Sequence, residues 1–364
     1  MMNRREFLRC AGAGSATLAL ADTSSLFALA PAARWRTFEV TTDVEILHPN
    51  GTTRLWLPLP PRASTSYQEP AGADSFVAHG GTARAVVDRK TGARMIAAEW
   101  PDGVKPALTA TSRVVTRDYA VDLASTRHAP SAGEAELQRF LQPTSLLPTD
   151  GIVRATAMEI TSHAKTDVDK ARAIYEWIVE NTHREASVLG CGVGDIRFML
   201  ESKSYGGKCA DLNALYVGLA RAAGLPARDV YGIRVAPSQL GYKSLGASSE
   251  VITKAQHCRA EVYLAEHGWT PVDPADVRKV MLEEPPGNLA ISDPKVVSAR
   301  ARLFGSWEMN WMAYNTAHDV ALPGAARKSL PFLMYPQAET GGERLDSLDP
   351  DGFRYKITAR EIRA

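Results

Sequence analysis

One cysteine of the chain lies where the sequence predicts the start of a helix. Gly206 and Gly207 precede Cys209, and residues 208–223 carry apolar side chains at the spacing of one helical face. The free backbone N–H groups and the positive dipole end of a helix start favour a thiolate over a thiol. Cys209 is therefore a candidate nucleophile, although free cysteines are also common as buried structural residues.

A nucleophilic thiol needs a base, and a hairpin downstream offers one. Residues 257–264 alternate in polarity as a strand does, and residues 269–272 predict the return strand, which ends at Asp273. An odd-length loop would place His257 and Asp273 on one face. A loop centred on Ala265 would set them opposite each other. A tight loop at residues 266–268 would leave them roughly 13 Å apart, so that a longer loop or a bulge would be needed.

Together these residues predict a catalytic triad. His257 would take the proton of Cys209, and Asp273 would orient and charge the imidazole. Taken singly, His257 is better explained as a strand histidine with satisfied hydrogen bonds and Asp273 as an ordinary turn residue before proline. The ordered set favours the catalytic interpretation.

The same segments resemble the transglutaminase-like superfamily of cysteine enzymes. The resemblance rests on the block GGKCADLNALYVGLARAAGLPAR, the pattern H-x-x-x-E-V-Y-L and the stretch GWTPVDPAD, within residues 152–276. It implies a papain-like α+β core with the nucleophile's helix against an antiparallel sheet. It also implies Cys209 as nucleophile, His257 as base and Asp273 as orienter. Arg259 departs from the pattern, because many members carry an aromatic residue two positions after the histidine.

The chain begins with a segment typical of an export signal. Residues 1–33 contain an Asn-Arg-Arg-Glu-Phe-Leu motif followed by an apolar run too short to span a bilayer. This is a twin-arginine pattern, which predicts export to a bacterial periplasm with no transmembrane segment after signal removal.

Three further regions follow the signal segment. Residues 34–130 are rich in strand patterns and predict an antiparallel β-sandwich or barrel without a catalytic cluster. Residues 131–300 hold the catalytic core, with two helices capped by Asp150 and Asp167, and are predicted to be loop-rich beyond Asp276. Residues 301–364 form a C-terminal extension whose strands, near residues 330–335 and 353–357, are expected to extend or flank the catalytic sheet. Asn310 and Asn315 are better explained as structural than as substrate-binding.

The remaining cysteines and the charge balance narrow the function. Cys191 and Cys258 form no zinc signature with Cys209, so no metal or cofactor is predicted. The two are either disulfide-bonded, which an oxidising periplasm permits, or free buried thiols. With 42 Lys and Arg against 41 Asp and Glu, the chain has no overall positive electrostatic field that would attract nucleic acid.

The sequence thus predicts an exported thiol enzyme that acts on amide or peptide bonds through a thioester. Water as acceptor gives a peptidase or amidase, and an amine gives a transglutaminase; the sequence leaves both open. The predicted substrates are peptides or proteins, cell-wall peptides among them. The alternative is a non-catalytic peptide- or envelope-binding module on the same fold.

Overall fold

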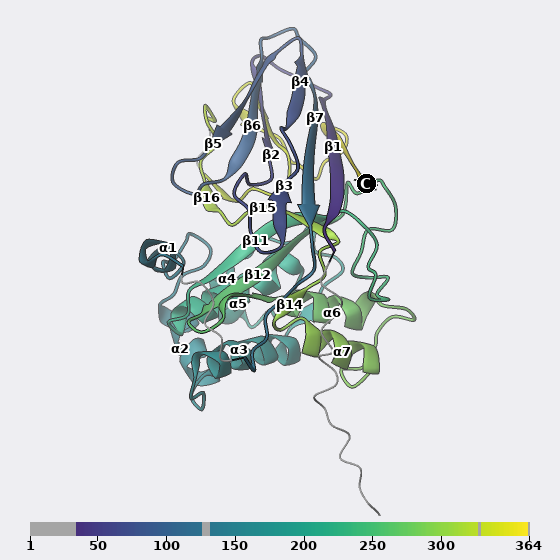
Figure 1. Ribbon diagram of the computed structural model, residues 1–364. Helices are drawn as coiled ribbons and strands as arrows, with labels where there is room; N and C mark the ends of the chain where they lie inside the picture. Colours follow the sequence, from purple (N-terminus) through teal and green to yellow (C-terminus); the bar gives the residue numbers. More distant parts are fainter. Residues whose placement is uncertain (1–33, 126–131, 327–328, 363–364) are drawn as a thin grey trace, which may run out of the picture. The chain divides into compact units, whose positions relative to one another are not determined.

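The computed structural model describes residues 34–125, 132–326 and 329–362 (Figure 1). From Trp35 on, the described residues form one compact unit of mixed α+β structure, which confirms the predicted fold class. The predicted signal segment, residues 1–33, lies outside the described residues. None of the helices in the described part of the chain has the length and apolar character needed to cross a membrane.

The strand-rich N-terminal region is a sandwich of two antiparallel sheets. One sheet has the order β20-β1-β7-β3, with β4 also paired to β7. The other has the order β19-β18-β2-β6-β5. Alternating side chains of both sheets meet in a common apolar core that includes Ile46, Leu57, Trp100 and Phe353. The strands are β1 (Arg36–Ile46), β2 (Thr53–Pro58), β3 (Gln68–Pro70), β4 (Ser75–His79), β5 (Thr82–Val87), β6 (Arg94–Trp100), β7 (Ala107–Thr116), β18 (Gln337–Thr340), β19 (Glu343–Arg344) and β20 (Phe353–Ile362).

The C-terminal strands β18, β19 and β20 thus complete the two sheets of the sandwich. β20 pairs with β1 in register from Thr37↔Ile362 to Ile46↔Phe353. It does not extend the catalytic sheet, but Ile357 and Ala359 pack against Ile233 of that sheet and so flank it. An alternating pattern predicts a strand and its buried face, whereas its pairing partner depends on distant residues.

The sheet of the predicted catalytic core is antiparallel, with the order β13-β12-β11-β15. Helix α5 packs on β12 and β11, and α2, α3 and α6 pack on α5 (Figure 1). All residues of α5 are buried, which places the helix in the core as its apolar pattern predicts. The bounds are α2 (Gly151–Ile160), α3 (Asp167–Asn181), α5 (Cys209–Ala222), α6 (Pro274–Glu283), β11 (Ala227–Arg234), β12 (Gln256–Leu264), β13 (Gly268–Val272) and β15 (Trp311–Asn315).

The segment after Asp276 is helical, and the prediction of a loop-rich stretch there is wrong. Asp273 and Asp293 each precede a proline and cap a helix, α6 and α7 (Pro294–Arg302) respectively. Aspartate at the N-cap with proline at the first helical position is a start signal in its own right. The expected cap at Asp167 is also one residue off, because Thr166 accepts from the Asp169 N–H in a capping box.

The remaining elements are short. Helices α1 (Glu134–Arg139) and α4 (Ile196–Ser202) flank the helical layer. Three two-stranded sheets pair β9 with β10, β8 with β14, and β16 with β17. Their bounds are β8 (Tyr119–Ala120), β9 (His183–Arg184), β10 (Gly206–Gly207), β14 (Ser306–Trp307), β16 (His318–Val320) and β17 (Leu330–Phe332).

Candidate active site

Cys209 is the first residue of α5, and a loop is fastened to the helix beside it. The Asp211 carboxylate accepts hydrogen bonds from the N–H groups of Lys208, Val193 and Gly194, each at 2.9 Å. The Ala210 N–H donates to the Cys191 carbonyl at 2.9 Å. These bonds hold residues 191–194, which we call the cysteine loop, against the start of the helix.

Gly192 lets the cysteine loop approach this closely. Its φ is +93°, and a Cβ built on it would lie 1.8 Å from the Asp211 Oδ2. Any larger residue would therefore displace the carboxylate that binds the loop to the helix, in addition to the strain of a positive φ.

The hairpin of β12 and β13 brings His257 and Asp273 together. Its register differs from both registers considered in the sequence analysis, the one with a loop centred on Ala265 and the one with a tight loop at residues 266–268. Leu264 pairs with Gly268 and Ala260 with Val272, so the loop has three residues, and its odd length puts both side chains on one face as predicted. In this register Asp273 lies two positions from the point opposite His257, a diagonal that side chains can bridge. The His257 Nε2 and the Asp273 Oδ2 are 2.7 Å apart.

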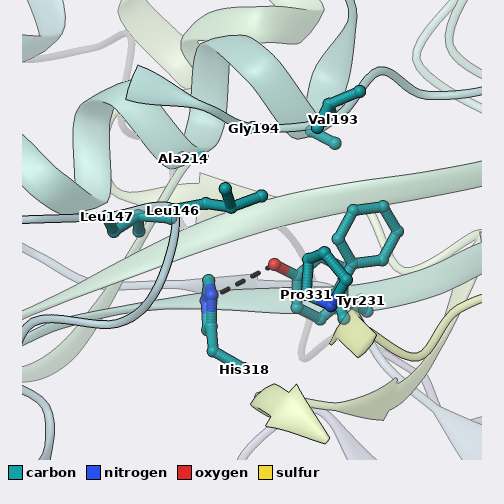
Figure 2. A pocket seen from close by; sticks show the side chains of 10 residues that line it. Leu146, Leu147, Val193, Gly194, Ala214, Tyr231, His318 and Pro331 are labelled. Carbon is teal, nitrogen blue, oxygen red and sulfur yellow. Dashed lines mark hydrogen bonds between the residues drawn. The ribbon is translucent and has the colours of Figure 1, made fainter. Parts of the chain in front are cut away.

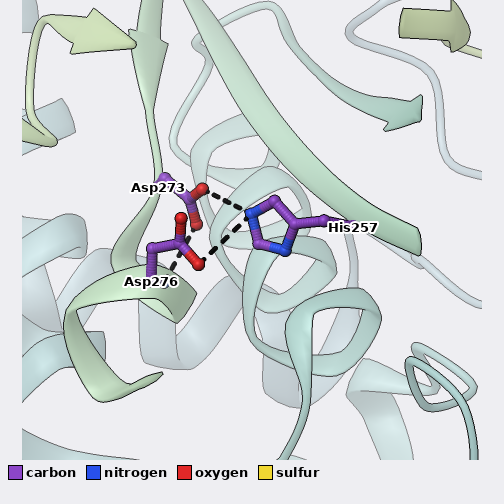
Figure 3. Close-up of side chains that lie close together, drawn as sticks. All are labelled: His257, Asp273 and Asp276. Carbon is purple, nitrogen blue, oxygen red and sulfur yellow. Dashed lines mark hydrogen bonds and ion pairs between the residues drawn. The ribbon is translucent and has the colours of Figure 1, made fainter. Parts of the chain in front are cut away.

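A second carboxylate, which the sequence analysis missed, approaches the same ring nitrogen. Asp276 Oδ1 lies 3.4 Å from His257 Nε2, and Figure 3 shows both carboxylates directed at this atom. Arg234 donates to both oxygens of Asp276, at 2.6 and 2.7 Å. Asp276 stands one helical turn after the N-cap Asp273, so the spacing Asp-x-x-Asp at a helix start was the signal available.

Burial and these charges set the protonation of His257. Burial alone lowers the pKa of His257, but the Asp276 carboxylate, followed by Asp273 and the Cys209 sulfur, outweighs both burial and the opposing Arg234. The net shift of the pKa is upward, towards an imidazolium. Since both carboxylates face Nε2, Nδ1 remains for Cys209, to which the imidazole hydrogen-bonds.

Cys209 has the opposite shift. Hydrogen bonds from the Cys191 and Cys258 thiols, and the charge and hydrogen bond of His257, hold the pKa of Cys209 well below its ordinary value in spite of burial. The pKa values of Cys191 and Cys258 are raised well above the ordinary value, by Cys209 and by burial. The arrangement therefore favours one thiolate, at Cys209, between two neutral thiols and an imidazolium.

The three cysteines are free, and no Cys191–Cys258 disulfide joins them. Both outer thiols interact with Cys209, and the Gln256 carbonyl oxygen, 3.3 Å from Cys191 Sγ, is a second acceptor within reach of the single Cys191 thiol proton. Of the two alternatives left by the sequence, the structure has the free buried thiols.

Asn213, one turn after Cys209 on α5, connects this helix to the hairpin. Its Nδ2 donates to the Cys258 carbonyl at 2.8 Å and to the Asp273 Oδ1 at 3.2 Å. The Asp273 Oδ1 also accepts from the Asp276 N–H at 3.1 Å. Asp273 is thus held by a side chain and a backbone amide, which leaves its other oxygen for His257.

Arg259 occupies the position where the resemblance leads one to expect an aromatic residue. Its guanidinium lies 5.3 and 4.8 Å from the ring centres of Trp307 and Trp311, and its Nε lies 3.7 Å from Asp273. Burial and Arg234 lower the pKa of Arg259 to about 10. The aromatic surface beside the triad is therefore supplied by two tryptophans from β14 and β15.

Two hollows border the site. The first is small, lies beside Ala210 and Gly194 and is lined largely by apolar residues, with Tyr231 hydrogen-bonded to His318 at 3.4 Å (Figure 2). The second is lined by the charged groups around Asp276 and by Tyr242 and Leu245 of the 236–254 loop.

The other residues considered from the sequence have structural contacts. Asn310 is buried and donates to the carbonyls of Ala236 and Leu245. Asn315 donates to the Leu333 carbonyl at 2.8 Å. Among the described residues, His257, Asp273 and Asp276 could together hold a metal ion. Both oxygens of Asp276 already accept from Arg234, so a cation there would compete with a guanidinium.

Comparison with known proteins gives one match over most of the chain and others over part of it. Residues 154–274 match the model of the transglutaminase-like superfamily. An uncharacterized protein of Haemophilus influenzae is 35% identical over 343 residues, which cover 89% of this chain and 91% of that protein. The uncharacterized protein YebA of Bacillus subtilis is 28% identical over 141 residues, which cover 37% of this chain and 19% of that protein.

A solved structure shares the fold. It is that of a candidate cysteine protease from Cytophaga hutchinsonii, with a TM-score of 0.57 and 14% identity, covering 91% of this chain and 92% of that one. At this identity the likeness shows the fold alone, and it extends over both the strand-rich region and the core.

Proposed function

We propose, from the premise that the chain belongs to the transglutaminase-like superfamily, that it is a thiol enzyme acting on amide or peptide bonds. The observation that carries the proposal is the buried His257–Asp273 pair, 2.7 Å between Nε2 and Oδ2, with Cys209 beside the same ring. The three residues belong to different elements, and the shifts of the Cys209 and His257 pKa values favour a thiolate and an imidazolium.

The reaction divides into two steps. The Cys209 thiolate attacks the amide carbonyl carbon, and the His257 imidazolium gives its proton to the leaving amine, which leaves a thioester. Neutral His257 then takes a proton from water or from an amine, whose attack on the thioester releases the acyl group and the sulfur. Asp273 holds the imidazole throughout and stabilises its charged form.

The oxyanion of each tetrahedral intermediate needs donors near the sulfur. The backbone N–H of Cys209 has no hydrogen-bond partner in the part of the chain that the structure describes, as expected for the first residue of a helix. We assign this N–H to the oxyanion.

Access to the sulfur requires movement. Cys209 is 3% exposed and His257 4%. A peptide therefore reaches the sulfur only after neighbouring side chains move aside, and the cysteine loop with its exposed Val193 is the nearest surface segment. We assign the substrates to peptides or proteins, cell-wall peptides included, met in the periplasm after twin-arginine export.

A thiol-reactive probe distinguishes an enzyme from a binding module. Iodoacetamide should alkylate Cys209 near neutral pH much faster than a model thiol, and His257→Ala should slow that reaction. His267→Ala is the matched control, because His267 lies in the loop of the same hairpin and away from the triad. Alkylation of Cys209 at the rate of a model thiol would favour the non-catalytic binding module.

A second experiment identifies whether water or an amine accepts the acyl group from the thioester. Amide donors incubated with and without a primary amine separate hydrolysis from acyl transfer, because an amine acceptor appears in the product. Cys209→Ala should abolish both reactions. Turnover that persists in this variant would remove Cys209 from the mechanism.

A further inference from the structure

The surroundings of Cys209 contain a second thiol that the proposed amide chemistry does not use. The Cys191 thiol hydrogen-bonds to Cys209, and the two backbones are also joined, because the Ala210 N–H donates to the Cys191 carbonyl at 2.9 Å. Cys191 stands between Gly190 and Gly192, both with positive φ. Exposed side chains flank it, Leu189 at 76% and Val193 at 62%.

We propose that Cys191 and Cys209 form an oxidative modification site, in which a peroxide oxidises Cys209 and Cys191 closes a reversible disulfide with it. A thiolate beside a second thiol is the usual arrangement of a redox-sensitive cysteine. Because Cys209 is buried, peroxide reaches its sulfur only through the same movement of neighbouring side chains that a peptide substrate needs. The proposal rests on the proposed function only in that both need an ionised Cys209.

The chemistry takes two steps. The Cys209 thiolate attacks one peroxide oxygen, the O–O bond breaks, and a sulfenic acid forms while hydroxide leaves. The Cys191 sulfur then attacks the Cys209 sulfur, the S–O bond breaks, and the departing hydroxide takes the Cys191 proton to form water. The peroxide is reduced to two waters, and the two thiols are oxidised to one disulfide.

Cys191 is a better partner than Cys258, although both thiols interact with Cys209. Cys258 lies within β12, paired on one side with Tyr231, and is fully buried. A disulfide requires a sulfur–sulfur distance of about 2.05 Å, so one partner must approach. A loop residue between two glycines can make that movement, whereas a residue in a central strand cannot do so without breaking ladder hydrogen bonds.

Such a disulfide would inactivate the proposed enzyme and protect it. While the disulfide is present, the Cys209 sulfur cannot attack a substrate. A reductant that breaks the disulfide restores the free Cys209 thiol. Without Cys191, the sulfenic acid would react with further peroxide to a sulfinic acid, which reductants do not reverse. Cys191 would thus convert irreversible damage into a reversible state.

The test uses the purified full chain, hydrogen peroxide and peptide mass mapping without reductant. We expect the wild-type chain to lose two hydrogen atoms, to yield a linked Cys191–Cys209 peptide, and to recover alkylation of Cys209 after reductant. Cys191→Ser should instead accumulate Cys209 with two added oxygens and fail to recover. Cys258→Ser is the matched control and should still form the linked peptide.

Two results would overturn the proposal. One is oxidised wild-type protein whose Cys209 is linked to Cys258 or carries added oxygens without any link to Cys191. The other is a Cys191→Ser chain that recovers as completely as the wild type. These measurements need no amide substrate. A result that overturns the disulfide proposal therefore does not count against the proposed amide chemistry. In the same way, a lack of amide turnover does not affect the disulfide test.

Discussion

Asp276→Asn should lower the pKa of His257, because Asp276 is the strongest of the charges that raise it. The substitution keeps the shape of the side chain and removes its charge. Its effect should appear in the upper inflection of the pH profile of Cys209 alkylation, where the imidazolium loses its proton. The sign follows from the raised pKa in the wild type, since removal of a carboxylate destabilises the charged ring and moves the inflection to lower pH.

The magnitude follows from the distance. Two opposite unit charges at the 3.4 Å between His257 Nε2 and Asp276 Oδ1 attract by about 5 kcal/mol at an effective dielectric constant of about 20. One pKa unit corresponds to about 1.4 kcal/mol, so the upper bound is roughly three and a half units. Relaxation and entering water reduce this bound, and we expect a fall of at least about one unit.

The Arg234 side chain provides the matched controls. Arg234→Gln removes the charge that opposes imidazolium formation and should shift the inflection to higher pH. The double variant removes both charges of the pair and should lie between the single variants. It also avoids the cost of about 3–5 kcal/mol for leaving one buried charge unpaired, so it stays informative if Asp276→Asn unfolds. An inflection in folded Asp276→Asn at or above the wild-type pH would refute the electrostatic assignment.

Three further predictions concern the supports of the site. Gly192→Ala should lower the melting temperature more than Gly103→Ala, because both have positive φ but only Gly192 faces the Asp211 carboxylate, and equal losses would contradict this. Asn213→Ala should lower the free energy of unfolding in urea by about 1–3 kcal/mol, since it removes the two hydrogen bonds that buried oxygens accept from Nδ2; no measurable loss would exclude that role. Because the pKa of Asp276 is lowered in the folded state, its carboxylate stabilises the fold fully above the ordinary pKa of an aspartate, and this contribution is lost as the pH falls further. Below about pH 4 the wild type should therefore lose stability more steeply than Asp276→Asn. Parallel curves of stability against pH for the two proteins would contradict this prediction.

The sequence predicted best where one local signal sufficed. The apolar face of residues 208–223 and the glycines before it locate α5, which begins at Cys209. The alternation after His257 locates β12, and the parity of a three-residue loop puts His257 and Asp273 on one face. These features depend only on period and turn length, which neighbouring residues determine.

What the sequence missed depends on residues brought together from distant elements. Arg234 ends β11, and nothing in its neighbourhood indicates a bidentate bond to Asp276, 42 positions later. The contact of Cys191 with Cys209 depends on hydrogen bonds to one carboxylate, Asp211. Helix α6 was missed for a different reason, since Asp273-Pro274 was interpreted only as the end of a strand when the same pair also starts a helix.

The stability of the fold does not account for the presence of four buried charges around His257. Asp273, Asp276, Arg234 and Arg259 are all buried, and burying ion pairs often stabilises a fold no more than apolar residues of the same size would. The two positive and two negative charges cancel, so these residues add no net charge to the core. Their arrangement nevertheless produces an electrostatic field at His257. That field raises the pKa of His257, and the imidazolium in turn helps to hold Cys209 as a thiolate. Variants that replace the Arg234–Asp276 pair by neutral residues should therefore change the titration of the site more than the stability of the fold, which is the behaviour of a network selected for the charge on its histidine.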